Sequence, residues 1–230
     1  MALPKLETPI YELKLPSTGD KIKFRPFLVK EYKILLTTLE SDSEEITRIV
    51  TELVDVCTFN KLDMNMLANF DIEYIFLNMR AKSISEITHL TLKCENCDNK
   101  IPFDLDLTNA KIEKNDNHTS KIQLTDDIIL EMRYPKFNEM IDIYENFKSD
   151  RVILLLSSCI KSVYTKDKVY EEYTSDELLE FVNSFSKLQF DMLENFFLTM
   201  PKLVHRVEQD CNVCGTKNNL KLEGLENFFV

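Results

Sequence analysis

Two short stretches decide how this chain folds, Leu92-Lys93-Cys94-Glu95-Asn96-Cys97-Asp98-Asn99-Lys100 and Asp210-Cys211-Asn212-Val213-Cys214-Gly215-Thr216-Lys217. Each contains a Cys-x-x-Cys pair flanked by residues that alternate as β-strands do. Four thiolates in two such pairs satisfy the tetrahedral coordination of Zn²⁺, and a closed four-sulfur shell has no position for water or substrate. We therefore expect one structural zinc ion with the ligands Cys94, Cys97, Cys211 and Cys214.

The two pairs lie far apart in the chain. The segment 98–210, about half of the sequence, separates them, so the predicted metal site joins two distant hairpins in a split zinc ribbon. These hairpins are expected at 86–107 and 203–222. Structural zinc supplies about 10–16 kcal/mol of apparent binding free energy in zinc-finger peptides, as much as the whole stability of a small domain. Removal of the metal is therefore expected to damage the fold.

Three other interpretations of the cysteines stay open, one of which is that their spacing is a coincidence. Pairs at this spacing also form local disulfides or redox-active dithiols. Cys57 and Cys159 are left over, and the N-terminus has neither the basic nor the apolar region of a secretion signal, which argues against disulfides. Thiol oxidoreductases place the reactive cysteine at a helix N-terminus, whereas both pairs here are expected in hairpin turns.

The composition is that of a globular, water-soluble protein of one or two lobes. Hydrophobic residues make up 44% and charged residues 29% of the 230. The net charge of −11 argues against a protein that mainly grips nucleic acid, because phosphate binding needs a positive surface. The longest strongly apolar run, 152–156, is far shorter than the ~20 residues that cross a bilayer. We expect a cytosolic protein with no membrane or nucleic-acid partner.

Periodicity predicts the remaining elements. Alternation with turn residues between predicts a β-hairpin over 11–27. Apolar residues at helical spacing predict helices over 28–39, 46–57, 71–82, 137–147, 150–162, 174–185 and 186–199. Strand-like residues occupy 122–134, a short hairpin is expected at 163–170, and 108–120 reads as a polar surface loop. The expected fold is α+β and mainly helical, with an N-terminal β-hairpin and a split zinc ribbon made of two Cys-x-x-Cys hairpins.

Three regions follow from this order of elements. The first, 1–85, holds the N-terminal β-hairpin and helices. The second unites 86–107 with 203–230 in the zinc ribbon and the C-terminal segment. The third, 108–202, is an inserted and mainly helical lobe.

No reactive constellation stands out in the sequence. Three glycines in 230 residues make a phosphate-binding loop improbable, and no nucleophile elbow or His-Glu-x-x-His motif occurs. Only three histidines are present, so a catalytic triad or a catalytic zinc site has few candidate members. We expect a protein that is not an enzyme.

Several stretches resemble one family in the order in which they occur. They are Pro9-Ile10-Tyr11-Glu12-Leu13-Lys14-Leu15-Pro16, Lys23-Phe24-Arg25-Pro26-Phe27, Tyr74-Ile75-Phe76-Leu77 with Arg80-Ala81-Lys82-Ser83, Asn195-Phe196-Phe197-Leu198-Thr199-Met200-Pro201, and Leu220-Lys221-Leu222-Glu223-Gly224-Leu225. Together they are similar to the baseplate hub protein family of T-even-like contractile-tailed bacteriophages. The similarity covers most of the chain and is weakest around 108–120.

The resemblance implies a non-enzymatic protein of tail morphogenesis, either a component of the central baseplate hub or a factor for its assembly. Its partners would be other hub and tail proteins of the phage. It would act in the host cytoplasm during assembly and, as a resident component, would remain in the tail baseplate of the virion. The family brings no catalytic residues, and only the four cysteines carry over, as expected ligands. The alternative is a zinc-ribbon adaptor acting on nucleic acid in phage transcription or replication.

Two groups of residues are candidates for partner binding. Lys21, Lys23 and Arg25 share one strand face, which is either a solvated surface or a docking strip for an acidic partner. Phe228 and Phe229 lie at the C-terminus, where chain ends usually fray. They either fold back onto the protein's own core or join the basic strip in a docking surface, since exposed aromatic residues make effective interface anchors.

Overall fold

This computed structural model describes residues 6–38, 43–136, 139, 143 and 151–223. The chain forms two compact units. Unit 1 comprises Met1–Asp63, Phe70–Glu113 and Lys202–Val230, and unit 2 comprises Met64–Asn69 and Lys114–Pro201. In the described part of the chain, no helix is both long and apolar enough to span a bilayer.

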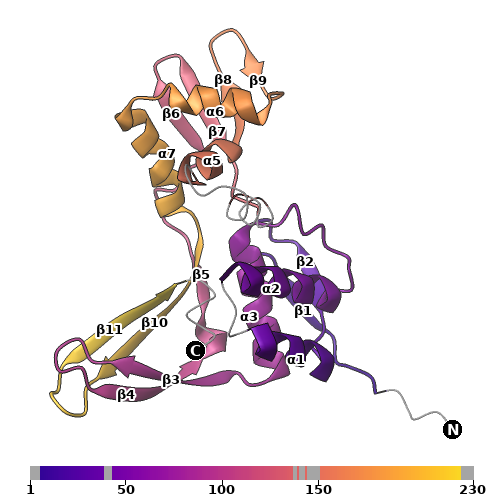
Figure 1. Cartoon of the computed structure of the whole chain (residues 1–230), viewed down its shortest axis with the longest axis vertical. Coiled ribbons are helices and arrows are strands. Elements are labelled where there is room, and N and C mark those ends of the chain that lie inside the picture. The colour runs from indigo at the N-terminus through magenta and orange to yellow at the C-terminus, as the bar shows by residue number, and fades with distance from the viewer. Residues whose placement is uncertain (1–5, 39–42, 137–138, 140–142, 144–150, 224–230) are drawn as a thin grey trace. The chain divides into compact units, whose positions relative to one another are not determined.

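The first part of unit 1 consists of a hairpin and three helices (Figure 1): β1 (Tyr11–Lys14), β2 (Lys21–Phe24), α1 (Val29–Thr38), α2 (Ser43–Cys57) and α3 (Asn69–Ser83). β1 and β2 pair antiparallel, with Tyr11 opposite Phe24, which confirms the predicted N-terminal hairpin. α2 buries its predicted apolar stripe, and Cys57 at its end is fully buried. Asp71 of α3, also fully buried, accepts hydrogen bonds from the N–H and the hydroxyl of Ser17, which fixes the β1–β2 turn on α3.

The second part of unit 1 is built from two hairpins far apart in sequence: β3 (Ile87–Lys93), β4 (Lys100–Asp106), β10 (Lys202–Asp210) and β11 (Lys217–Glu223), with the short helix η1 (Leu107–Asn109) and strand β5 (Lys111–Glu113). β3 pairs with β4 and β10 with β11, as predicted, and β5 adds to the other edge of β10. Alternate residues of β3 face inward, which is the pattern of strands with one buried face. Residues of both hairpins share one apolar core with α3: Leu77, Leu92, Leu105, Leu203, Val207 and Leu222.

Unit 2 is a four-stranded antiparallel sheet with helices, formed by β6 (Lys121–Thr125), β7 (Ile128–Met132), α5 (Arg151–Ser158), β8 (Ile160–Tyr164), β9 (Val169–Tyr170), α6 (Ser175–Asn183) and α7 (Lys187–Thr199). The strand order is β6-β7-β8-β9, so β6 is an edge strand. Capping boxes open both α6, at Thr174 and Glu177, and α7, at Ser186 and Gln189. The sequence Thr174-Ser175-Asp176-Glu177 has the pattern that predicts a capping box, and the structure confirms it.

The prediction of a mainly helical α+β fold is wrong. The structure is 36% helical and 30% strand, with six α-helices and four small sheets among the described residues. One reason is β5, which lies in the segment 108–120 that reads as a polar loop. Another is the predicted helix 150–162, which ends as α5 at Ser158 and is followed directly by β8. Neither change is marked by a glycine or proline, which are the usual signals in sequence.

One histidine of unit 2 lies in an aromatic setting. The ring of His118 lies 4.8 Å from that of Phe196 and 5.7 Å from that of Tyr134, between centroids. Its Nδ1 is 3.0 Å from the hydroxyl of Thr199, and its buried Nε2 finds no hydrogen-bond partner among the described residues. Burial lowers the pKa of His118 below its usual 6.5, so the folded protein holds this ring neutral.

This setting predicts a pH dependence of stability. Because the pKa of His118 is lowered in the folded state, the unfolded chain takes up the proton first. The stabilisation is complete above pH 6.5 and decreases as the pH falls from there through the folded pKa. Urea unfolding should show that the free energy of unfolding falls between about pH 7.5 and pH 5.5. This fall should be smaller in His118→Phe, because phenylalanine keeps the ring stacking but has no proton to titrate. If the free energy of unfolding falls equally with pH in the variant, another group is responsible, for example His205. Burial also lowers the pKa of His205.

Candidate metal centre

The two Cys-x-x-Cys turns have the same backbone geometry. In each, the N–H of the first cysteine donates to the carbonyl five residues later, from Cys94 to Asn99 at 2.9 Å and from Cys211 to Thr216 at 2.8 Å. Each turn is therefore closed by its own hairpin. The strand, Cys-x-x-Cys, strand pattern that recurs in the sequence corresponds to a repeated structural unit, which we call a knuckle.

Both knuckles also place a residue in the left-handed region one position after the second cysteine. Asp98 has φ 57° and Gly215 has φ 71°. Glycine adopts this conformation without strain, and aspartate is among the few other residues that tolerate it. The sequence therefore allows the tight turn that brings the two thiols of each knuckle to one side.

The knuckles meet so that four thiols form one cluster. All four Sγ atoms lie within 4.8 Å of one another, and no residue of a third element joins them in the part of the chain that the structure describes. Sγ of Cys94 is 3.6 Å from that of Cys214, and the same distance separates Cys97 from Cys211. Tetrahedral zinc with Zn–S bonds of about 2.3 Å requires sulfur atoms about 3.8 Å apart. The donor set and its spacing therefore fit a four-coordinate metal ion.

The cluster has a buried half and an exposed half. The first cysteine of each knuckle, Cys94 or Cys211, is buried in the apolar core of the hairpins, and the second, Cys97 or Cys214, is exposed. A metal ion bound here would be anchored in the core and would also be within reach of solvent.

The electrostatics of the four thiols favours a bound cation. Hydrogen bonds from the hydroxyl and the N–H of Thr216 lower the pKa of Cys214 to about 5, and the N–H groups of Cys214 and Val213 lower that of Cys211. The N–H of Asn99 also lowers the pKa of Cys97, but the neighbouring thiols outweigh it and raise that pKa to about 12. A divalent cation would offset the repulsion between neighbouring thiolates and so allow all four groups to ionise.

Two asparagines link the knuckles directly. Asn218, 1% exposed, accepts a hydrogen bond from the N–H of Glu95 at 3.0 Å and donates to the carbonyl oxygens of Gln209 and Thr216. Asn99 donates to the side-chain oxygen of Asn212 across the same junction. Neither asparagine is predicted from the sequence as a link, because an asparagine near a turn is usually explained by the turn itself.

Replacement of Asn218 by alanine should weaken the junction. The N–H of Glu95 would lose its partner at a partly buried site, which costs about 1–3 kcal/mol of unfolding free energy. Loss of such outer contacts also lowers metal affinity by about 10–100-fold in known sites. Thermal unfolding and competition with a chromogenic chelator would measure both effects. Asn219→Ala, an exposed neighbour on the same strand, is the control and should change neither.

Comparison with known proteins gives the family. The model of the T4 bacteriophage base plate protein family matches residues 8–230. The chain belongs to this family. No curated protein and no solved structure matches it. Membership assigns the chain a structural or assembly role in the phage base plate, in contact with other base plate proteins, and confirms the resemblance seen in the sequence.

The remaining cysteines and histidines of this base plate protein lie outside the cluster. Cys57 and Cys159 are fully buried, and burial raises the pKa of their thiols to about 11 and about 12. Both therefore stay protonated and act as small core residues. His89 is exposed on β3 and pairs with Asp104, and His205 lies on β10. Neither is part of the thiol cluster.

The structure describes three of the five residues predicted to bind partners. Lys21 and Lys23 are exposed on β2. Arg25 follows β2 but turns inward, where its guanidinium, 13% exposed, donates to the buried carboxylate of Glu31 at 3.0 Å. The other two, Phe228 and Phe229, lie outside the described residues.

Proposed function

We propose that the protein is a non-enzymatic component of, or assembly factor for, the central hub of the phage base plate, and that it acts through contacts with other hub and tail proteins. The family match over 8–230 is the observation that carries this proposal. In this proposal the protein works in the host cytoplasm during tail assembly. Residence in the finished virion would distinguish a component from a factor that leaves.

We further propose that the thiol cluster binds one zinc ion with a structural role. Four sulfur donors favour zinc over harder cations such as Mg²⁺ or Ca²⁺. When bound, the metal would supply a rigid link between the knuckles, with no open coordination position for a reaction. In a reducing cytoplasm a metal link of this kind persists where a disulfide does not. A rigid link suits a protein that presents surfaces to partners.

The test is a phage in which this gene carries a nonsense mutation. The mutant should yield filled heads without complete tails in electron micrographs of lysates, and a wild-type copy supplied in trans should restore infectious particles. Mass spectrometry of purified virions then separates a component, which is present, from an assembly factor, which is absent. Normal tails from the mutant would contradict the proposed function.

The zinc-ribbon adaptor for nucleic acid is the competing function, and a gel shift separates the two. With a net charge of −11, the protein should bind neither DNA nor RNA in a salt-sensitive manner. Submicromolar binding that weakens steeply with salt would favour the adaptor.

A further inference from the structure

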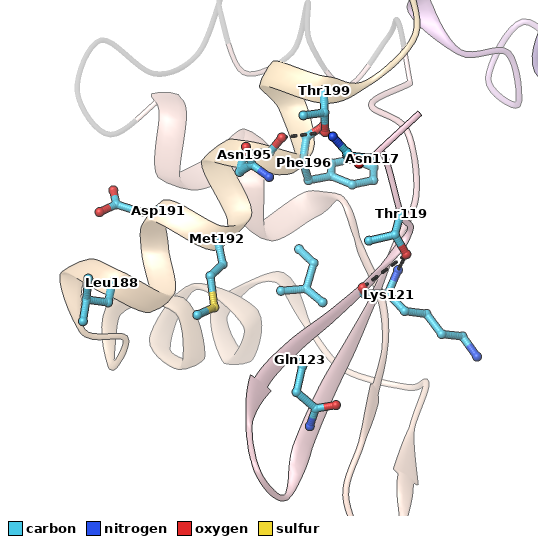
Figure 2. Close-up of a pocket in the computed structure, with 11 residues that line it drawn as sticks. Asn117, Thr119, Lys121, Gln123, Leu188, Asp191, Met192, Asn195, Phe196 and Thr199 are labelled. Atoms are coloured by element: carbon cyan, nitrogen blue, oxygen red, sulfur yellow. Dashed lines mark hydrogen bonds between the residues drawn. The ribbon is translucent and has the colours of Figure 1, made fainter. Parts of the chain in front are cut away.

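Unit 2 contains an open groove between the edge strand β6 and helix α7. Its volume is about 440 Å³, and its walls include Lys121, Ile122 and Gln123 from β6 and Leu188, Met192 and Asn195 from α7. Figure 2 shows that the two elements converge near Thr119 and Thr199 and diverge toward Gln123 and Leu188. Every residue of the groove belongs to unit 2, so the site is complete within this unit.

One wall of the groove offers the unpaired backbone N–H and C=O of Gln123, whereas the hydroxyl of Thr119 bonds to both the N–H and the C=O of Lys121, at 3.2 and 3.4 Å. β6 pairs only with β7 among the described strands. The N–H of Met132 donates to the carbonyl of Ser120, and Ile122 lies two residues further along, opposite Leu130. Because bonded and non-bonded pairs alternate in an antiparallel ladder, Gln123 belongs to a non-bonded pair, and its N–H and C=O point away from β7. An edge of this kind is a template for a further strand.

The other wall, formed by α7, is mixed: it carries Asp191, Asn195 and Thr199 and also exposed apolar side chains. α7 packs Leu193 and Phe196 into the core of unit 2 but leaves the side chains of Leu188 and Met192 75% and 43% exposed. Both line the groove. In Figure 2 the Met192 side chain extends from α7 into the space between the helix and β6. Large apolar side chains beside a free strand edge can accept every second side chain of an added strand.

The charges of the groove are nearly balanced. The carboxylate of Asp191 already pairs with Lys187 at 2.5 Å, and Lys121 lies 5.7 Å from the centroid of the Tyr164 ring. One cation is too little for a nucleic-acid backbone, and no array of charges faces a charged peptide. The groove therefore suits an uncharged polypeptide segment that presents apolar side chains to Leu188 and Met192.

We propose that this groove binds an extended segment of another base plate protein, which adds to β6 as a further strand and inserts apolar side chains at alternate positions against Leu188 and Met192. This inference rests on the proposed function, because it names the kind of contact through which the protein would act in assembly. The irregular register after Gln123 and the Thr119 hydroxyl on Lys121 limit direct pairing to Gln123, so a longer added strand would have to displace that hydroxyl, and α7 limits access to a single segment. These features would restrain the edge from uncontrolled aggregation.

The test uses the full-length protein and a panel of overlapping peptides of about 12 residues, long enough for one strand. The panel covers the other tail proteins of the same phage and, separately, this chain itself, with fluorescence anisotropy as the readout. Uncharged peptides with alternating apolar residues should bind. Methylation of alternate backbone nitrogens in a bound peptide should abolish binding, because strand addition depends on main-chain hydrogen bonds.

Variants of the protein locate the contact. Leu188→Glu should weaken peptide binding by about tenfold or more, as expected for an anchor at the centre of an interface. Leu198→Glu is the matched control: it changes another leucine of α7, 72% exposed, that does not line this groove, and it should leave binding unchanged. Gln123→Pro should also abolish binding, since it removes an outward N–H that the β6–β7 ladder does not use. If Gln123→Pro does not fold, the two leucine variants still decide the question.

Three results would overturn the inference: no peptide binds, the two leucine variants lose binding equally, or only peptides from this chain itself bind, which would indicate a second copy as the occupant. Failure here is distinguishable from failure of the proposed function. A nonsense mutant with normal tails contradicts the function, whereas a mutant without tails that is fully rescued by Leu188→Glu contradicts the groove alone.

Discussion

Replacement of Cys214 by serine is expected to unfold unit 1 or to make the protein insoluble. Cys214 is exposed, so exchange of its sulfur for oxygen would change stability little if it were only a surface thiol. As a ligand, it contributes to a metal site that supplies about 10–16 kcal/mol in finger peptides, more than most domains have in reserve. The expected result is a large fall in the thermal midpoint together with loss of bound metal. Cys97→Ser, the exposed ligand of the other knuckle, should behave in the same way.

The controls are the two cysteines outside the cluster. Cys57→Ser and Cys159→Ser each place a hydroxyl in the core, at a cost of about 1–3 kcal/mol, and should leave the metal content unchanged. Metal analysis of the purified wild-type protein should find one zinc ion per chain, with six free thiols after denaturation and removal of the metal. A metal-free protein with two disulfides, or a Cys214→Ser variant as stable as the wild type, would contradict the metal centre.

Arg25→Ala is expected to destabilise the folded protein by about 3–5 kcal/mol, because it leaves a buried carboxylate without its main partner. Glu31 is 5% exposed on its side chain. Burial alone would raise its pKa, but hydrogen bonds from Arg25 and from the N–H of Leu28 outweigh this and lower it. The exposed ammonium of Lys30, 3.4 Å from the same carboxylate, would compensate only in part. Chemical denaturation of the variant measures the loss.

Lys21 and Lys23 provide the comparison within the same basic strip. Lys23 forms a 3.6 Å pair with Glu12, and both side chains are more than half exposed, so Lys23→Ala should cost at most about 1 kcal/mol. If the strip is a docking surface, Lys21→Ala and Lys23→Ala should fold normally and impair tail assembly. A stable Arg25→Ala variant that fails only in assembly would instead make Arg25 a docking residue.

Local patterns in the sequence predicted those features whose formation depends on residues close together in the chain. The thiols of the cluster are recognisable from their spacing, and the capping box at Thr174 from the identity of two side chains. The stripe of α2 follows from a single helical period. In each of these cases, residues close together in sequence carry the information.

The features that were missed depend on distant partners. β5 is a strand because β10, about 90 residues later, lies beside it, and nothing in 111–113 indicates that neighbour. α5 and the start of β8 fall within one predicted helix, 150–162, and their boundary is set by the sheet that β8 joins through β7. Arg25 has the period of an outward strand residue, but β2 has already ended at Phe24, and Glu31 draws the side chain inward. Tertiary context decided each of these positions.

The division of the thiol cluster between two distant segments of the chain sets an order of events during synthesis. A ribosome adds about 5–20 residues per second, so the 113 residues between Cys97 and Cys211 take roughly 6–23 s to make. Throughout that interval the first knuckle has only two of its four ligands, while the residues of unit 2 emerge and can fold. Capture of the proposed metal ion would therefore be a late step, possible only after Cys214 has been made. A truncated product that ends before Cys211 would lack the link between the hairpins and would be open to proteolysis, so metal binding would also distinguish chains that contain both knuckles from those that contain only the first.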